Sequence, residues 1–296
     1  MLSKKIIILD FDGTITDAEV EGKPYKEGYI EDLALIIDKD LSDIQNQVQE
    51  IEEEIHQNAQ NFGWIYNDKI VAPATVDPYL RVMPIARILL ERNQINLDPY
   101  LRDRILDRIL YKYNYPKTTL AFKDGAQDFF RFLSNQNHIE TYVITNSHTL
   151  PVQEKIRVLG EKGEFDWLVQ RVFGSAKKYV VDSNWNASFQ GIPLPSEMQI
   201  PSLQRPVYLQ RKHYFEAITK ICATHNVQTM ENLLVIGDIF ELDLALPLTL
   251  GANVALMTND HTPQYEKDFL ATHPRGTLVS NLNDVSTLIQ TTTFTK

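Results

Sequence analysis

Short apolar runs rich in β-branched residues recur along the sequence, separated by segments with helical periodicity. The runs span residues 5–9, 141–144, 169–173, 233–236, 254–257 and 277–279. Continuous apolar runs of this length are typical of strands that are buried on both faces of a parallel sheet. Helical patterns between several of them span residues 126–133, 214–224 and 242–250. The alternation predicts an α/β fold, with a doubly wound parallel sheet covered by helices on both faces.

The segment of about 100 residues after the first run contains few strand-like patterns. One helical face is formed by residues spaced three or four apart, which are Ile44, Val48, Ile51, Ile55 and Ala59. Two more helices are predicted around residues 85–89 and 105–110. We expect residues 15–119 to form an inserted α-helical cap domain over the strand ends. Residues 1–14 and 120–296 would then form the α/β core domain.

A second insertion spans about residues 175–206. Its turn-forming residues are Asn184, Asn186, Gly191, Pro193, Pro195, Pro201 and Pro206. Proline and glycine interrupt regular elements, so this composition predicts a loop or an irregular hairpin.

The composition excludes several classes of function. Lys and Arg number 29 and Asp and Glu 39, giving a net charge of −10, which is a poor match for nucleic acid. An acidic chain can still bind a small phosphorylated substrate through a local cation. The single cysteine, Cys222, lies in an apolar pattern typical of a buried thiol. No apolar run approaches the ~18–20 residues of a membrane span. We expect a cytoplasmic protein without nucleic-acid or membrane partners.

Polar side chains follow several of the predicted strands, or open the helix before one. They are Asp10, Asp12, Thr145, Asn146, Lys212, Asp238 and Asp243. Each alone is ordinary, since an Asp-Gly pair is usually a turn and an aspartate often caps a helix. Together they would meet at the carboxyl edge of the sheet, where open α/β sheets bind ligands. Carboxylates gathered there repel one another unless a cation lies among them, and oxygen ligands suit Mg²⁺.

These residues give the chain a resemblance to the haloacid dehalogenase superfamily, in its phosphatase branch with a helical cap. The four motifs are Asp10-x-Asp12-Gly13-Thr14, the strand ending in Thr145-Asn146, Lys212, and Gly237-Asp238-x-x-x-x-Asp243. The resemblance covers residues 1–14 and roughly 120–280. It implies a Rossmann-like core and a phosphohydrolase that acts on a small phosphorylated substrate.

The resemblance also implies a role for each residue. Asp10 would attack phosphorus and form an aspartyl-phosphate, and Asp12 would be the general acid and then the base. Thr145, Asn146 and Lys212 would hold the phosphoryl oxygens. Mg²⁺ would lie between Asp10, the backbone carbonyl of Asp12, and Asp238, with Asp243 as a ligand through water or an orienting neighbour. The second aspartate of the first motif argues against dehalogenase activity.

Several alternatives stay open at this point. Lys177 or Lys178 could be the lysine of the third motif, although residues 213–224 look like the helix that follows Lys212. The same motifs fit a phosphomutase, which returns the phosphoryl group to its substrate. A catalytically silent, partner-binding protein is a third interpretation. The oligomeric state, monomer or homodimer, and the identity of the substrate are undecided.

Overall fold

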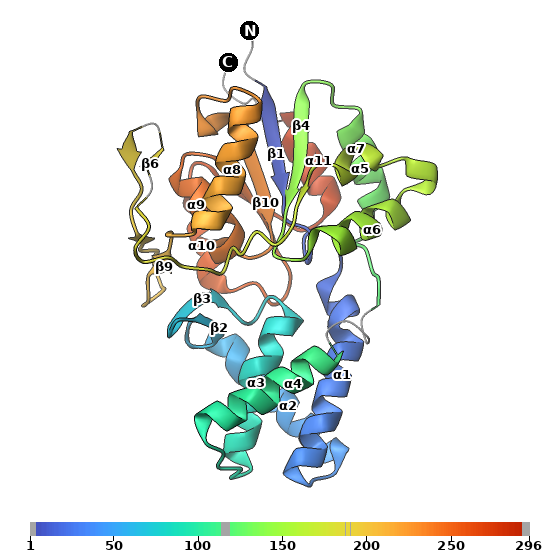
Figure 1. The fold of residues 1–296 in the computed structure, drawn as a ribbon, viewed down its shortest axis with the longest axis vertical. Coiled ribbons are helices and arrows are strands. Elements are labelled where there is room, and N and C mark those ends of the chain that lie inside the picture. The colour runs from blue at the N-terminus through green and yellow to red at the C-terminus, as the bar shows by residue number, and fades with distance from the viewer. Residues whose placement is uncertain (1–3, 114–118, 187, 190, 292–296) are drawn as a thin grey trace.

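The computed structural model describes residues 4–113, 119–186, 188–189 and 191–291, and it confirms the predicted parallel sheet (Figure 1). Six strands lie in the order β12-β11-β10-β1-β4-β5, and each neighbouring pair is parallel. Their bounds are β1 (Lys5–Leu9), β4 (Ile139–Ile144), β5 (Val172–Phe173), β10 (Leu233–Gly237), β11 (Asn253–Met257) and β12 (Gly276–Val279). The chain builds outward from β1 to β5, then returns to β10 on the other side of β1. The strand order therefore reverses beside β1, where such sheets bind ligands.

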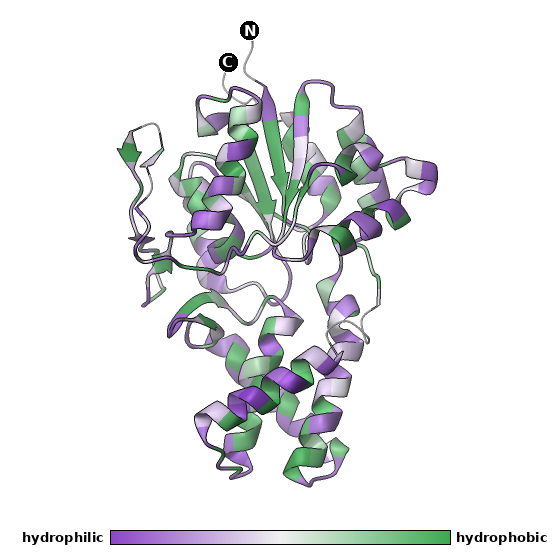
Figure 2. Ribbon diagram, viewed as in Figure 1, coloured by the Kyte–Doolittle hydropathy of each residue, from purple (hydrophilic) through white to green (hydrophobic). Residues whose placement is uncertain are grey.

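Both faces of the sheet are buried, because successive side chains of a strand point to opposite faces. Ile6 and Ile8 of β1 belong to one apolar core, and Ile7 and Leu9 belong to another. The first core is covered by α8 (Lys212–Thr224), α9 (Ala245–Thr249) and α10 (Gln264–Thr272). The second is covered by α5 (Ala126–Ser134), α6 (Thr149–Leu159), α7 (Asp166–Val169) and α11 (Leu282–Thr291). Figure 2 shows the apolar strands between these more polar helices.

The insertion after β1 has an apolar core of its own, formed by its helices. Its elements are α1 (Ala18–Ile37), α2 (Leu41–Gln57), η1 (Ala59–Asn61), β2 (Gly63–Tyr66), β3 (Lys69–Pro73), α3 (Pro78–Arg92) and α4 (Pro99–Tyr113). The three predicted helices are confirmed as α2, α3 and α4. The insertion lies beyond the carboxyl ends of the strands (Figure 1). The division into two domains at residues 14 and 120 stays a prediction.

Two elements of this insertion were not predicted. Helix α1 contains Gly22 and Pro24, which disfavour helix and obscure its pattern. A Cβ atom on Gly22 would lie 2.7 Å from Cγ of Pro78, so glycine lets α1 approach the start of α3. The insertion is also not purely helical, because β2 and β3 pair as an antiparallel hairpin. Strand β2 is only partly buried, and the short apolar run of β3 contains Pro73, which weakens the strand signal.

The second insertion, with the two residues after it, forms two small antiparallel pairs, in agreement with the predicted loop or irregular hairpin. The pairs are β6 (Ser188–Phe189) with β7 (Ile192–Pro193), and β8 (Glu197–Met198) with β9 (Val207–Tyr208).

Two element predictions are corrected in detail. The run at residues 169–173 is strand only from Val172, because Val169 ends helix α7 and packs in the second core. The predicted helix at residues 242–250 begins as a single π-helical turn, η4 (Phe240–Leu244), before α9. Turns of this kind often accompany functional sites. Here the carboxylate of Asp243 accepts a hydrogen bond of 3.1 Å from the backbone N–H of Ile239, which precedes the turn.

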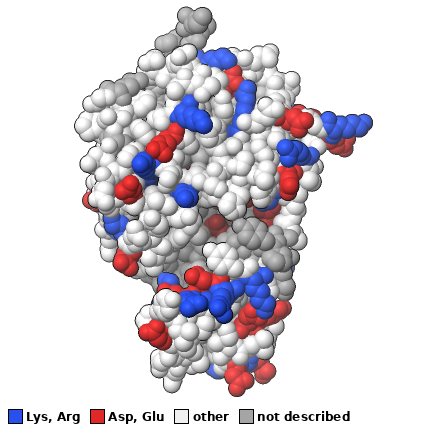
Figure 3. All heavy atoms as spheres, viewed as in Figure 1, with Lys and Arg blue, Asp and Glu red and all other residues white. Residues whose placement is uncertain are grey.

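The described part of the chain contains no helix that is both long and apolar enough to span a membrane. Acidic and basic side chains are interspersed on the face drawn in Figure 3.

Arg205 ties the second insertion to the rest of the molecule. Its guanidinium donates two hydrogen bonds, of 2.6 and 2.7 Å, to the buried carboxylate of Glu241. It also donates to the backbone carbonyls of Gln60 at 3.2 Å and Ile70 at 3.4 Å. Breaking a buried ion pair by removing one partner is strongly destabilising, because the other charge is left uncompensated. Arg205 therefore joins both insertions to Glu241, which follows β10.

We expect Arg205→Met to lower the free energy of unfolding by about 3–5 kcal/mol, because it leaves the buried carboxylate of Glu241 without its cation. Urea unfolding measures the loss. Arg92→Met is the matched control, because Arg92 pairs with Glu50 and Glu54 on the surface. Exposed pairs contribute about 0–1 kcal/mol. Equal losses in the two variants would contradict this account of Arg205.

Candidate functional site

One cavity of about 410 Å³ lies at the carboxyl ends of β1, β4 and β10. Of the seven site residues predicted from the sequence, six line it, namely Asp10, Asp12, Thr145, Asn146, Asp238 and Asp243. Three separate stretches of sequence meet there because parallel strands place their carboxyl ends at the same edge. The structure thus brings these six residues together, while their chemical roles stay predictions.

The lysine at the centre of the site is Lys178, and the preference for Lys212 is corrected. The ammonium of Lys178 lies 2.7 Å from carboxylate oxygens of both Asp10 and Asp243. Lys178 is 1% exposed. Lys212 begins α8 and lines a different cavity, together with Tyr66. Arg211, which directly precedes this helix, is the residue whose side chain is fully buried.

The segment after β5 carries Lys178 into the site by following the loop after β4. The N–H of Ser175 donates to the carbonyl of Ser147 at 2.7 Å, and the N–H of Ala176 donates to that of Thr145 at 3.0 Å. The N–H of Lys178 then donates to the side-chain oxygen of Asn146 at 2.7 Å. Asn146 therefore positions the lysine through its carboxamide oxygen.

Arg211 fixes the other side of this segment from within the protein. Its guanidinium donates to the backbone carbonyl of Lys178, and to that of Val71 in β3 at 2.7 Å. Burial lowers the pKa of Arg211 to about 10, although Glu241 and Asp243 favour its charge. The backbone at Lys178 is therefore held from both sides, by Asn146 and by Arg211.

Three groups of the site have raised pKa values, namely Asp10, Asp238 and Lys178. Burial raises the pKa of Asp10 to about 7, and the nearby Asp243 adds to this effect while Lys178 opposes it. Burial, together with Asp10 and Asp243, also raises the pKa of Asp238 well above its usual range. Burial works against the charge of Lys178, but its two carboxylate partners outweigh that effect and raise its pKa. Buried carboxylates of this kind favour a bound cation.

Three of these carboxylates fit a divalent metal ion. Asp10, Asp238 and Asp243 each offer an oxygen atom, and the three atoms lie within 4.8 Å of one another. An all-oxygen set with few protein ligands matches the preference of Mg²⁺, which keeps several of its waters. The donor set of this structure therefore fits the metal that the sequence predicted.

Gly13 allows the first motif to approach Asp238. Its φ is +81°, in the left-handed region that favours glycine. A Cβ atom added there would lie 2.0 Å from a carboxylate oxygen of Asp238. The glycine of the first motif thus places the backbone against the aspartate of the fourth.

Asp12 has a set of partners that sequence reasoning missed. Its carboxylate accepts hydrogen bonds from the hydroxyls of Ser147 at 2.6 Å and Thr145 at 3.4 Å, and from Lys155 at 3.1 Å. Lys155 also pairs with the buried Glu21 of α1 at 2.9 Å. Lys155 and Glu21 lie inside helices, so no strand-end pattern could have indicated them.

The family comparison agrees with this geometry. The family model for haloacid dehalogenase-like hydrolases matches residues 4–195. The chain belongs to this hydrolase family. The matched range includes the first motif, the second motif and Lys178. Residues 238–243 of the fourth motif lie beyond it, and the structure adds them to the same cavity.

Solved structures share the fold of the chain at low sequence identity. One is a predicted phosphoglycolate phosphatase from Haemophilus somnus, with 14% identity and a TM-score of 0.51, covering 98% of this chain and 100% of the other. Another, named as a candidate beta-phosphoglucomutase from Thermotoga maritima, has 11% identity and a TM-score of 0.50, covering 97% and 98%. At such identities the likeness concerns the fold. A search among curated proteins found no match.

In this hydrolase, Gly13→Ala should destabilise the fold more than Gly125→Ala, as thermal unfolding would measure. Both glycines have similar φ values, +81° and +78°, so both variants carry about 1–2 kcal/mol of left-handed strain. A Cβ atom on Gly125 would come no closer than 4.0 Å to Asn283. The excess loss for Gly13 therefore measures its contact with Asp238, and equal losses would contradict that contact.

Proposed function

We propose that the protein is a Mg²⁺-dependent phosphatase that hydrolyses a phosphate monoester through an aspartyl-phosphate on Asp10. The observation that carries the proposal is the setting of Asp10. Lys178 lies 2.7 Å from one of its oxygens, and Asp238 and Asp243 complete a carboxylate group that fits a divalent cation. Membership of a hydrolase family supports the same reaction class.

In the first step, a carboxylate oxygen of Asp10 forms a bond to phosphorus as the bond from phosphorus to the leaving oxygen breaks. A carboxylate and an anionic phosphoryl group repel each other, so the step requires positive charge. Mg²⁺, held by Asp10, Asp238 and Asp243, would neutralise phosphoryl oxygens when bound. Lys178 supplies positive charge from the protein itself, and Thr145 would donate its hydroxyl to a phosphoryl oxygen.

Asp12 would serve both steps as the proton carrier. It gives a proton to the leaving alkoxide, and it then accepts a proton from the water that attacks the aspartyl-phosphate. That attack releases inorganic phosphate and restores the carboxylate of Asp10. Ser147 and Lys155 position Asp12 for both transfers, because each contacts one of its carboxylate oxygens. A phosphomutase would use the same residues but return the phosphoryl group to its substrate.

The proposed function is tested by release of inorganic phosphate with nitrophenyl phosphate and alkyl phosphates as substrates. Mg²⁺ should be required, and a chelator should abolish turnover. Asp10→Asn should remove all turnover, because an amide cannot form the phosphoenzyme. Asp12→Asn should lose about 10²–10⁴-fold on alkyl phosphates, whose leaving groups need a proton. With nitrophenyl phosphate it should show a burst near one equivalent and then stall.

Each outcome of this test is decisive. Full activity in excess chelator would contradict the metal. A burst in Asp10→Asn would show that the two aspartates have exchanged roles. Transfer of the phosphoryl group to a second position of the substrate, without free phosphate, would favour the phosphomutase. Absence of turnover with every ester would favour a partner-binding protein.

Lys178 and Lys212 give a matched pair of variants. Lys178→Met should lower kcat by about 10²–10³-fold, the range for removing one oriented group that stabilises the transition state. Lys212→Met should leave turnover unchanged, since Lys212 lines another cavity. Thermal unfolding of both variants controls for damage to the fold. Loss of activity in Lys212→Met alone would restore Lys212 to the third motif.

A further inference from the structure

The cavity continues from the aspartates toward the insertion, where the leaving alcohol of a bound monoester must lie. The walls there come from Trp64, Asp77, Tyr79 and Leu80, all of the insertion. The ring of Trp64 stacks on Tyr179 with centroids 4.1 Å apart. Tyr79 contacts the buried ring of Tyr25 at 4.7 Å. Neighbouring rings therefore hold both aromatic walls in place.

We call the part of the cavity between Trp64, Asp77, Tyr79 and Leu80 the leaving-alcohol chamber. The charge around this chamber is predominantly negative. Six carboxylic acids and one lysine are among the described residues that line the cavity, and the ammonium of Lys178 contacts Asp10. A divalent cation at Asp10, Asp238 and Asp243 would be offset by the phosphoryl group itself, with its charge of about −1.5 to −2 at pH 7. The excess of negative charge therefore faces the leaving alcohol.

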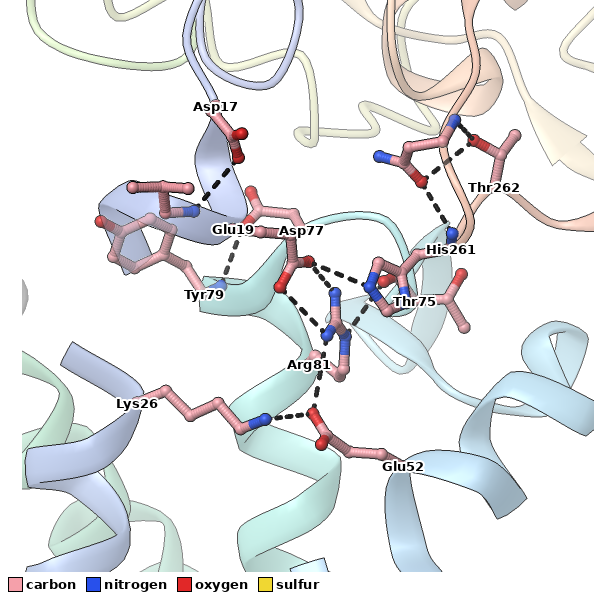
Figure 4. Close-up of polar contacts among 12 residues, drawn as sticks. Asp17, Glu19, Lys26, Glu52, Thr75, Asp77, Tyr79, Arg81, His261 and Thr262 are labelled. Carbon is pink, nitrogen blue, oxygen red and sulfur yellow. Dashed lines mark hydrogen bonds and ion pairs between the residues drawn. The ribbon is translucent and has the colours of Figure 1, made fainter. Parts of the chain in front are cut away.

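The cations at and beside the chamber are already paired. Lys155 pairs with Asp12 and Glu21, and Lys178 pairs with Asp10 and Asp243. Arg81, one turn beyond Asp77 in α3, pairs with Glu19 and lies 3.5 Å from Glu52 (Figure 4). A leaving alcohol with a carboxylate or a second phosphate would thus meet acidic groups and cations that are already occupied.

Asp77 is one of two carboxylates that the insertion presents to the cavity, and the other, Glu21, is paired with Lys155. Asp77 caps helix α3, and one of its oxygens accepts a hydrogen bond of 2.7 Å from the N–H of Tyr79 (Figure 4). In the described part of the chain, its other oxygen has no hydrogen-bond partner. Aromatic rings and a carboxylate together form the environment that binds organic cations, through cation–π attraction and a charge pair.

We infer that the substrate is a phosphate monoester whose leaving alcohol carries a positively charged ammonium group, which Asp77 selects together with Trp64 and Tyr79. The inference rests on the proposed function and adds the class of its substrate. An ammonium group in this chamber balances the excess of carboxylates, and its alkyl surface contacts the rings. Asp77 is a specificity-determining residue here, while the phosphoryl chemistry remains with Asp10 and Asp12.

The test uses two esters of the same shape, choline phosphate and 3,3-dimethylbutyl phosphate, in which carbon replaces the charged nitrogen. We expect kcat/KM of the Mg²⁺-loaded enzyme to favour the choline ester by about tenfold or more, the range of a close, desolvated charge pair. Asp77→Asn should bring the ratio of the two kcat/KM values close to one. Asparagine is as good a helix cap as aspartate, so the fold of α3 is kept.

Asp17→Asn is the matched control. Asp17 caps helix α1 as Asp77 caps α3, accepting from the N–H of Val20 at 3.1 Å, but it does not line the cavity (Figure 4). This variant removes the same charge and should keep the wild-type ratio. Trp64→Leu should lower the ratio independently of Asp77, because it removes one aromatic wall.

Equal kcat/KM values for the two esters in the wild-type enzyme would overturn the inference, as would an unchanged ratio in Asp77→Asn. A preference for phosphoglycolate or glycerol phosphate over choline phosphate would also overturn it, in favour of an anionic or polyol substrate. In all these cases nitrophenyl phosphate is still hydrolysed, so the proposed function stands. Loss of Mg²⁺ response in Asp77→Asn would reassign Asp77 to the metal. Failure to hydrolyse any ester, including nitrophenyl phosphate, would overturn the proposed function itself.

Discussion

The buried ammonium of Lys178 is the interaction on which the whole site depends. It joins Asp10, which follows β1, to Asp243, which follows β10, while Lys178 itself follows β5. Two carboxylates and an ammonium would each be costly to bury alone, and they are tolerated because each satisfies the others. The strand order β10-β1-β4-β5 is what allows this meeting, since it places β1 and β10 side by side and leads the segment after β5 back along the loop after β4.

The two insertions are held on this site through arginines that are buried or nearly so. Arg211 joins the backbone carbonyl of Lys178 to that of Val71, and Arg205 joins Glu241 to the carbonyl of Ile70. Both contacts end on β3, so the β2–β3 hairpin is fixed against the loops at the carboxyl edge of the parallel sheet. The same hairpin carries Trp64 to the cavity. The position of an aromatic wall of the chamber is therefore tied to the network that holds the central lysine.

Much of the fold and most of the site could be predicted from the sequence, for physical reasons. Strands buried on both faces require continuous apolar runs, and parallel strands bring their following residues to one edge. That reasoning placed Asp10, Thr145 and Asp238 together. Applied to the run at 169–173, it also indicates Lys178. Lys212 was preferred because a helix does begin there, but the start of a helix does not determine which side chain turns inward, and Arg211 does so.

What the sequence could not indicate is the contact between separate elements. Gly22 and Pro24 interrupt the helical sequence pattern of α1. Glu21 of this helix contacts Lys155 only once α1 and α6 have packed together. Lys155 then holds Asp12, so the insertion is coupled to the proposed proton carrier as well as to the leaving-alcohol chamber. Because Glu21 is buried, its charge requires a partner, and that partner is Lys155. If Lys155 moved away, both Glu21 and Asp12 would lose their cation. The placement of the insertion and the geometry of Asp12 are thus determined by one set of contacts.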